Sequence, residues 1–119
     1  MEKQFPASVA KVLYNLGMEH EEELCGLDAL HDGKTAAFFP RGLPLLLVRL
    51  GGEVFALRNS CAHMGCPLTG AELRGGVLTC PCHDWRFDVR GGRFLDAPEL
   101  SLQSYPVAIR NGKVFVRTP

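Results

Sequence analysis

The sequence predicts an all-β domain, an antiparallel sandwich or a small barrel, on three observations. Many short apolar runs of strand length follow one another from residue 24 onward. Glycine-containing turns separate many of these runs. No long helical pattern falls between the strands, which argues against a doubly wound α/β fold. At 119 residues the chain has the size of one domain with a modest core.

The expected strands are short and closely spaced. They cover residues 24–26, 35–39, 44–50, 53–58, 77–79, 85–89, 93–95, 105–110 and 113–117. Two of the turns between them, Gly51-Gly52 and Asn111-Gly112, read as two-residue hairpin loops, because both positions of such a loop favour positive φ. This pairing of strands through tight turns is what predicts antiparallel sheets.

The beginning of the chain has a different pattern. Apolar side chains recur there at helical spacing, at Phe5, Val9, Val12, Leu13 and Leu16. We therefore expect a short amphipathic helix over residues 6–16. Its apolar stripe can pack on its own domain, which is the usual outcome, or serve as a docking arm for a partner.

The acidic run at residues 19–23 is predicted to be a solvated linker after this helix. The chain then divides into an N-terminal helical extension with an acidic linker, residues 1–22, and a β domain, residues 23–119.

Composition narrows the classes of function. Lys and Arg together number 13, and so do Asp and Glu, so the formal charge is zero. A neutral chain lacks the electrostatic footprint of a nucleic-acid binder. The longest apolar stretch, residues 43–48, is far too short for a membrane span, and the first residues lack the apolar core of a secretory signal. We therefore expect a cytoplasmic protein without a direct membrane span.

Two short segments carry the candidate metal ligands. Cys61-Ala62-His63 and Cys80-Pro81-Cys82-His83 each supply a cysteine followed by a histidine. Zinc is one candidate, but zinc-finger sites group the two cysteines together and the two histidines together. One cysteine and one histidine from each loop suit a [2Fe–2S] cluster in which histidines replace two cysteines on one iron.

The two segments with their flanks resemble the cluster loops of the Rieske [2Fe–2S] family. The residues that carry this resemblance are Cys61–Cys66, Cys80–Asp88, Gly91-Gly92 and the ending from Tyr105 to Val116. The resemblance runs from about Leu24 to Arg117 and implies a Rieske-type fold with cluster loops at about residues 59–70 and 79–88.

The same resemblance implies the ligand roles. Cys61 and Cys80 would bind one iron as thiolates, and His63 and His83 would each bind the other iron through one ring nitrogen. A cluster with two neutral imidazoles has a reduction potential of about −150 to +300 mV, against about −400 mV for plant-type ferredoxins with four cysteines.

Cys66 and Cys82 match a disulfide that ties the two loops together in the high-potential respiratory branch of the family. A reducing cytoplasm favours free thiols instead. We expect the bridge, because both matched positions are cysteine, and closing such a loop contributes about 3 kcal/mol in the chain-entropy model. Cys25 has no evident partner and is expected to be a small buried apolar residue.

The chain departs from the high-potential branch at Trp85 and Phe87, where that branch carries a serine and a tyrosine whose hydroxyls bond sulfur. Trp85 and Phe87 have no hydroxyl, resemble the soluble Rieske-type ferredoxins, and are expected to fill the core beneath the loop. Because hydrogen bonds to sulfur raise the potential, we predict a potential in the lower or middle part of the Rieske range.

These features together predict a one-electron carrier, not an enzyme, with no catalytic residue of its own. Only His20 and His31 remain outside the cluster motifs, too few for the mononuclear iron of the related oxygenases. No glycine-rich nucleotide fingerprint is present. The implied partners are an upstream reductase and a downstream oxygenase or other oxidoreductase. The alternatives are a small Rieske subunit of a larger complex, nitrite-reductase-like or quinol-oxidising, and a zinc-stabilised interaction module.

Overall fold

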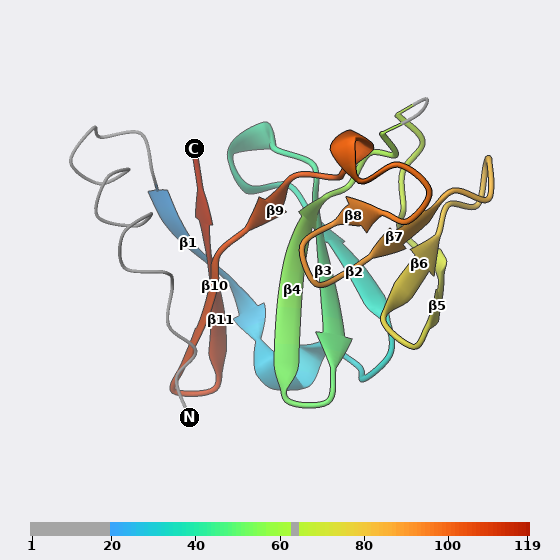
Figure 1. The fold of residues 1–119 in the computed structure, drawn as a ribbon. Helices are drawn as coiled ribbons and strands as arrows, with labels where there is room; N and C mark the ends of the chain where they lie inside the picture. Colours follow the sequence, from blue (N-terminus) through green and yellow to red (C-terminus); the bar gives the residue numbers. More distant parts are fainter. Residues whose placement is uncertain (1–19, 63–64) are drawn as a thin grey trace. The chain divides into compact units, whose positions relative to one another are not determined.

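The computed structural model describes residues 20–62 and 65–119. Its strands form three antiparallel sheets (Figure 1). Helical structure in this part of the chain is limited to three 3₁₀ turns, η1 (Leu27–Ala29), η2 (Pro40–Gly42) and η3 (Pro98–Leu100). No helix among these residues is long and apolar enough to cross a membrane. The helix predicted at residues 6–16 lies outside the described residues.

The chain forms two compact units, and the first contains residues 20–29 and 105–119 of the described chain. Its sheet has the order β1-β11-β10, built from β1 (His20–Gly26), β10 (Val107–Arg110) and β11 (Lys113–Thr118). Asn111 and Gly112 join β10 to β11 with φ of 52° and 73°. The hairpin turn predicted there is therefore confirmed at both positions.

The acidic run is part of this sheet rather than the solvated linker that we expected for it. Residues from His20 onward belong to β1, which pairs antiparallel with β11. The Glu21 carboxylate accepts two hydrogen bonds from Arg110 and lies 3.9 Å from the Arg117 guanidinium. Glu23 lies 3.6 Å from Lys113. The cations of β10 and β11 thus supply cross-strand partners for the carboxylates. These partners stabilise a strand in a segment whose sequence alone suggests a solvated linker.

The second unit, residues 30–104, begins with an antiparallel β2-β3-β4 arrangement. It consists of β2 (Thr35–Phe38), β3 (Leu45–Leu50) and β4 (Glu53–Arg58). The four side chains at 45–48 are all fully buried, so β3 is covered on both faces. The β3–β4 turn has a positive φ at Gly51 only, so the predicted geometry holds for one of its two positions.

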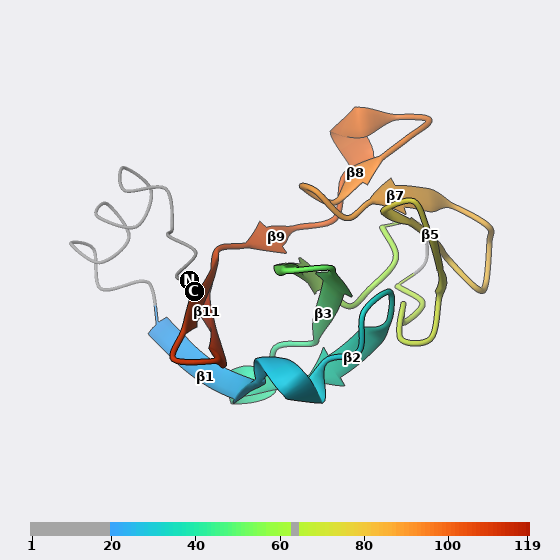
Figure 2. The same cartoon turned by 90° about the horizontal axis from the view of Figure 1, so that it is seen from below.

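The same unit contains a second sheet, which carries the candidate site. Its order is β5-β6-β7-β8, and Figure 2 shows it beside β2 and β3. The strands are β5 (Glu72–Arg74), β6 (Val77–Thr79), β7 (Arg86–Asp88) and β8 (Arg93–Phe94). β5 was not predicted, because its only apolar residue is Leu73. A short strand β9 (Ser104–Tyr105) spans the division between the two units.

The two sheets of the second unit share one apolar core. Leu46, Val48 and Leu57 come from β3 and β4, whereas Leu78 and Phe87 come from β6 and β7. The chain between β4 and β5 and the chain between β6 and β7 are the two segments with the candidate ligands. Both therefore start from strands that are fixed in this core.

Candidate metal centre

The two candidate loops have the same backbone hydrogen bonding. In the first loop, Cys61 N–H donates to the Cys66 carbonyl (2.8 Å) and Gly65 N–H donates to the Cys61 carbonyl (2.8 Å). The second loop repeats this pattern from Cys80, whose N–H donates to the Trp85 carbonyl (2.7 Å) and whose carbonyl accepts from Asp84 N–H (3.0 Å). Each cysteine is thus held at the start of a loop that is closed by two bonds, one to its N–H and one to its carbonyl.

A left-handed residue is required at the same place in both loops. Gly65 has φ 73° and Asp84 has φ 58°. Glycine takes this conformation without cost, and aspartate is among the few other residues that tolerate it. A glycine in the sequence indicates a possible left-handed residue, whereas an aspartate does not. The equivalence of the two loops was therefore not predicted.

We expect Asp84→Gly to keep or slightly raise stability and Asp84→Val to lower it by about 1–2 kcal/mol, because a β-branched side chain is strained at positive φ. Urea unfolding followed by circular dichroism measures both. Arg86→Val, on the neighbouring strand β7, is the matched control and should cost little, since valine suits a strand. Equal losses in Asp84→Val and Arg86→Val would contradict the conformational explanation.

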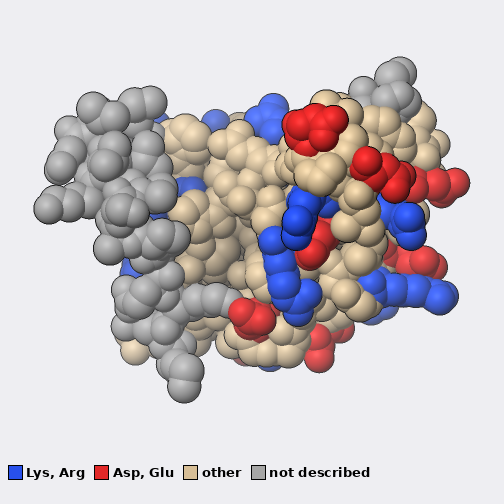
Figure 3. All heavy atoms as spheres, viewed as in Figure 1, with Lys and Arg blue, Asp and Glu red and all other residues tan. Residues whose placement is uncertain are grey.

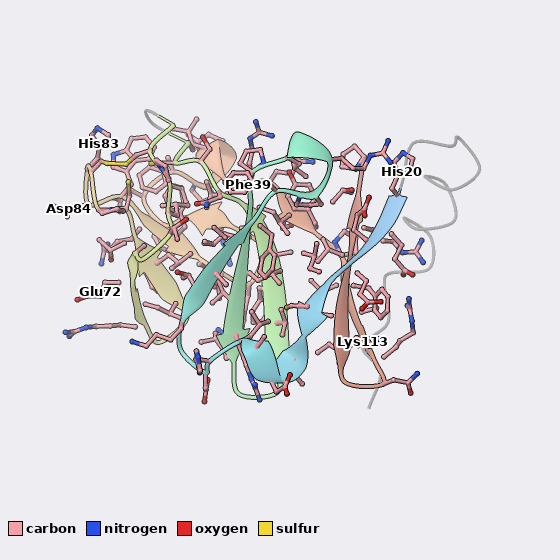
Figure 4. All side chains as sticks on the ribbon, turned by 180° about the vertical axis from the view of Figure 1, so that it is seen from behind. His20, Phe39, Glu72, His83, Asp84 and Lys113 are labelled. Carbon is pink, nitrogen blue, oxygen red and sulfur yellow. A yellow bond between two sulfur atoms is a disulfide. The ribbon has the colours of Figure 1, made fainter. Side chains whose placement is uncertain are left out.

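Three of the four predicted ligands meet at one point. One donor atom each from Cys61, Cys80 and His83 lies within 4.8 Å of the others. The two cysteines are buried, whereas His83 is exposed at the end of the second unit (Figure 4). The fourth, His63, lies outside the described residues. Two soft sulfur donors behind an outward imidazole fit a [2Fe–2S] cluster with mixed ligation, and the donor types alone also fit zinc.

A disulfide joins the two loops, as the resemblance implied. It links Cys66 to Cys82, with 6.5 Å between their Cα atoms, within the usual range for bridged cysteines. Cys66 is partly buried and Cys82 is exposed. The bridge therefore connects the end of the first loop to the residue before His83.

An aromatic layer supports the second loop from below. The rings of Trp85 and Phe94 are stacked, with centroids 4.1 Å apart and 4° between their planes. Phe87 is fully buried and its ring lies 5.4 Å from that of Phe94. These contacts agree with the expectation that Trp85 and Phe87 fill the core beneath the loop.

Asn59 closes the first loop from within and was missed in the sequence. Its side chain is buried; its Oδ1 accepts from Leu68 N–H (2.6 Å) and its Nδ2 donates to Thr69 Oγ1 (2.7 Å). Its N–H donates to the Pro44 carbonyl (3.0 Å). A buried amide with this set of partners fixes the loop, since an unpaired polar group there would be costly. No local pattern distinguishes this asparagine from one on the surface.

A third loop, which contains η3, is attached to β8 through Gly92. Leu102 N–H donates to the Gly92 carbonyl (2.7 Å), and a Cβ added at Gly92 would lie 2.5 Å from the Leu102 carbonyl oxygen. With φ 76° as well, this position needs glycine. The attachment places residues 101–103 opposite the first cluster loop, across a groove of about 340 Å³ that Arg58 and Cys61 also line.

Cys25 lies on β1 and is not bridged. Burial raises the pKa of its thiol, and the negative charge of Asp28 adds to the rise. The thiol therefore stays protonated at neutral pH, in line with the expected apolar role, but Cys25 is only partly buried and not fully buried as expected.

The comparisons with known proteins give the family. The Rieske [2Fe-2S] domain family matches residues 20–106. The chain is 33% identical over 97 residues to the ferredoxin component of the alkene monooxygenase system of Xanthobacter autotrophicus, covering 81% of this chain and 80% of that one.

Two solved structures have the same fold. The ferredoxin of carbazole 1,9a-dioxygenase from Nocardioides aromaticivorans is 30% identical with a TM-score of 0.74, covering 81% of this chain and 95% of that one. A putative NADH-dependent nitrite reductase small subunit from Mycobacterium tuberculosis is 25% identical with a TM-score of 0.76, covering 85% and 96%. The chain therefore belongs to the Rieske [2Fe–2S] domain family, and its cofactor is one [2Fe–2S] cluster.

Proposed function

We propose that this chain is a Rieske-type ferredoxin, which carries single electrons from a reductase to an oxygenase. The observation that carries the proposal is the placement of an exposed His83 imidazole over two buried thiols, Cys61 and Cys80. That arrangement occurs in a chain that is similar, over about four fifths of its length, to ferredoxin components of oxygenase systems. These relatives are electron carriers and not catalytic subunits.

We propose the ligand set Cys61 and Cys80 on the inner iron, and His63 and His83 on the outer iron. A bound cluster of this kind takes up and returns one electron at a time. The burial of both cysteines keeps water away from the sulfur-held end. The exposed imidazole of His83 then gives a route between the cluster and a partner.

Electron paramagnetic resonance on the dithionite-reduced protein tests this function at the level of the cluster. We expect a rhombic signal with an average g below that of clusters with four cysteine ligands. Reduction of the protein by a purified reductase and its reoxidation by an oxygenase component then test the carrier role. A colourless protein that contains stoichiometric zinc would overturn the proposal.

The end of the second unit that carries His83 also displays large apolar side chains. Phe39, Leu95 and Leu100 are exposed by 67%, 40% and 46%. Phe39 precedes η2 and Leu100 ends η3, and both turns lie at the same end of this unit as the cluster loops (Figures 1 and 4). Leu95 N–H donates to the Arg86 carbonyl (3.0 Å), just after the second loop. We propose that the redox partners dock on this end.

Charge on the face of the second unit that is seen in Figure 3 does not single out a docking surface. Acidic and basic side chains are interspersed on that face, without a large patch of one sign. An interface of this type gains affinity from a few buried apolar side chains, while the mixed charges set orientation. Phe39, with two thirds of its surface exposed, has the most to gain from a partner.

We expect Phe39→Asp to weaken coupling to an oxygenase about tenfold, as the loss of an interface anchor does. The measurement is oxygenase turnover against ferredoxin concentration. Gly52→Asp is the matched control: it adds the same charge in the β3–β4 hairpin at the other end of the unit, where a Cβ meets nothing within 4 Å. Dithionite reduction should be unchanged in both variants. Equal coupling to the oxygenase in Phe39→Asp and Gly52→Asp would contradict the proposal that partners dock at this end.

Voltammetry should give a potential in the lower or middle part of the range from about −150 to +300 mV. The reason is that Trp85 and Phe87 stand beside the second loop without a hydroxyl to donate to sulfur. The disulfide acts on the potential less directly than such hydrogen bonds. A potential near the top of the range would contradict the explanation that the missing hydroxyl donors keep the potential low.

A second candidate function is a small subunit of a larger oxidoreductase. It is favoured by the similarity to the putative nitrite reductase small subunit. A quinol-oxidising complex is favoured by the Cys66–Cys82 bridge and disfavoured by Trp85 and Phe87. Native mass spectrometry of the protein from its source separates these options, because a free monomer supports the carrier and a stable heteromer supports the subunit. The cytoplasmic location and the helical extension stay predictions, whereas β1 (His20–Gly26) runs across the predicted division between residues 22 and 23.

A further inference from the structure

Three sulfur atoms meet between the two loops. The Sγ atoms of Cys66, Cys80 and Cys82 all lie within 4.8 Å of one another. Two of them form the disulfide, and the third, on Cys80, is a free thiol. The other buried thiol, Cys61, is not a member of this trio. A thiol beside a disulfide is the arrangement needed for thiol–disulfide exchange.

We propose that, in the chain without a cluster, Cys80 exchanges with the Cys66–Cys82 disulfide, so that the three sulfurs form a thiol–disulfide exchange site. The Cys80 sulfur attacks Cys66 Sγ after losing its proton to water. The Cys66–Cys80 bond forms as the Cys66–Cys82 bond breaks, and the electron pair of the broken bond leaves on Cys82 Sγ, which takes a proton from water. One disulfide replaces another, so no oxidant or reductant is consumed.

The surroundings of the three cysteines give the direction of attack. Cys82 is exposed and Cys66 is partly buried, so a thiolate expelled from Cys82 is released into water, where it is solvated. Attack on Cys82 would instead join two cysteines separated only by Pro81, and so small a ring fits disulfide geometry poorly. The expected product therefore bridges Cys66 and Cys80.

Exchange would block reloading of the cluster, because it places Cys80 in a bridge. The thiolate, and not the disulfide, is the form that binds metal. A chain that has exchanged would accept iron and sulfide only after a dithiol has reduced the new bridge. This consequence rests on the ligand role proposed for Cys80, whereas the exchange itself does not.

The test measures which cysteines are free thiols before and after the exchange. The cluster is removed from the protein by acid and chelator, and the chain is kept at pH 8 without oxygen. The chain is then blocked with N-ethylmaleimide in denaturant, so that buried thiols react as well, and mapped by mass spectrometry without reduction. A fresh sample should carry labels on Cys25, Cys61 and Cys80. After incubation the label should leave Cys80 and appear on Cys82, while the number of labels per chain stays the same.

Two serine variants make the assignment specific. Cys80→Ser should keep its Cys66–Cys82 bridge throughout, whereas Cys61→Ser, which removes the other buried thiol, should exchange as the natural chain does. A label that stays on Cys80 in the natural chain would overturn the proposal. So would an increase in the number of labels, which means reduction rather than exchange, or transfer of the label to Cys82 in Cys80→Ser.

Reloading with iron and sulfide separates this proposal from the proposed function. The fresh chain should regain the cluster without a reductant, and the incubated chain should regain it only after dithiothreitol is added. If the label has moved to Cys82 and the cluster still returns without dithiothreitol, the exchange stands and the ligand role of Cys80 is wrong.

Discussion

Replacing Cys80 by serine is expected to abolish the visible absorption and the electron paramagnetic resonance signal of the cluster, whereas replacing Cys25 by serine leaves both unchanged. The two variants make the same chemical change. Cys80 is buried within 4.8 Å of the donor atoms of Cys61 and His83. A serine hydroxyl is a much harder and less acidic ligand than a thiol, so the inner iron loses half of its protein ligands.

Cys25 is a suitable control because its thiol has no part in the site. It lies on β1, among residues of the first unit, and its raised pKa keeps it protonated. Iron analysis should give about two irons per chain in Cys25→Ser and almost none in Cys80→Ser. Full iron content in Cys80→Ser, or an equal loss in both variants, would contradict the proposed ligand set.

Much of the fold follows from local patterns in the sequence. The run Leu45–Val48 is apolar at every position, as a strand covered on both faces requires, and Asn111-Gly112 has the residues that a tight hairpin turn requires. The strand β5 could not be found in this way, since Leu73 is its only apolar residue. It exists because β6 offers a free edge, which is a property of the sheet and not of residues 72–74.

The acidic run shows the limit of such patterns more clearly. Glu21 looks like a solvated residue when only its neighbours are considered. Its partners, Arg110 and Arg117, lie at the far end of the chain and reach it through the β1–β11 pairing. Charge pairing across strands is a long-range property, so composition alone predicts a linker where the protein has a strand.

The site divides in the same way between what is local and what depends on the fold. The ligand types and spacing of Cys61, Cys80 and His83 indicated that they meet, because metal chemistry constrains which residues can be used. The supporting bonds of Asn59 and the left-handed Asp84 depend on the loop conformation. Asparagine and aspartate are common on protein surfaces, so the sequence alone does not indicate that either residue has a structural role in its loop.

Truncating Phe87 to alanine should have the largest effect on stability, about 3–5 kcal/mol, as for other fully buried aromatic residues. Phe87 has no exposed surface, and its ring packs against Phe94, which in turn stacks on Trp85. The cavity would lie directly beneath the second loop. We therefore expect faster loss of the cluster on dilution into chelator as well as a lower urea midpoint.

Phe39→Ala is the matched control for this change, since it removes the same ring from a site that is 67% exposed. A surface substitution of this kind should alter stability by less than about 0.5 kcal/mol. Urea unfolding of both variants, followed by circular dichroism, measures the difference, and an unchanged urea slope would show that the two variants expose the same surface on unfolding as the natural chain. A loss below about 1 kcal/mol for Phe87→Ala would mean that the loops settle into the cavity, and the cluster should then be retained as firmly as in the natural chain.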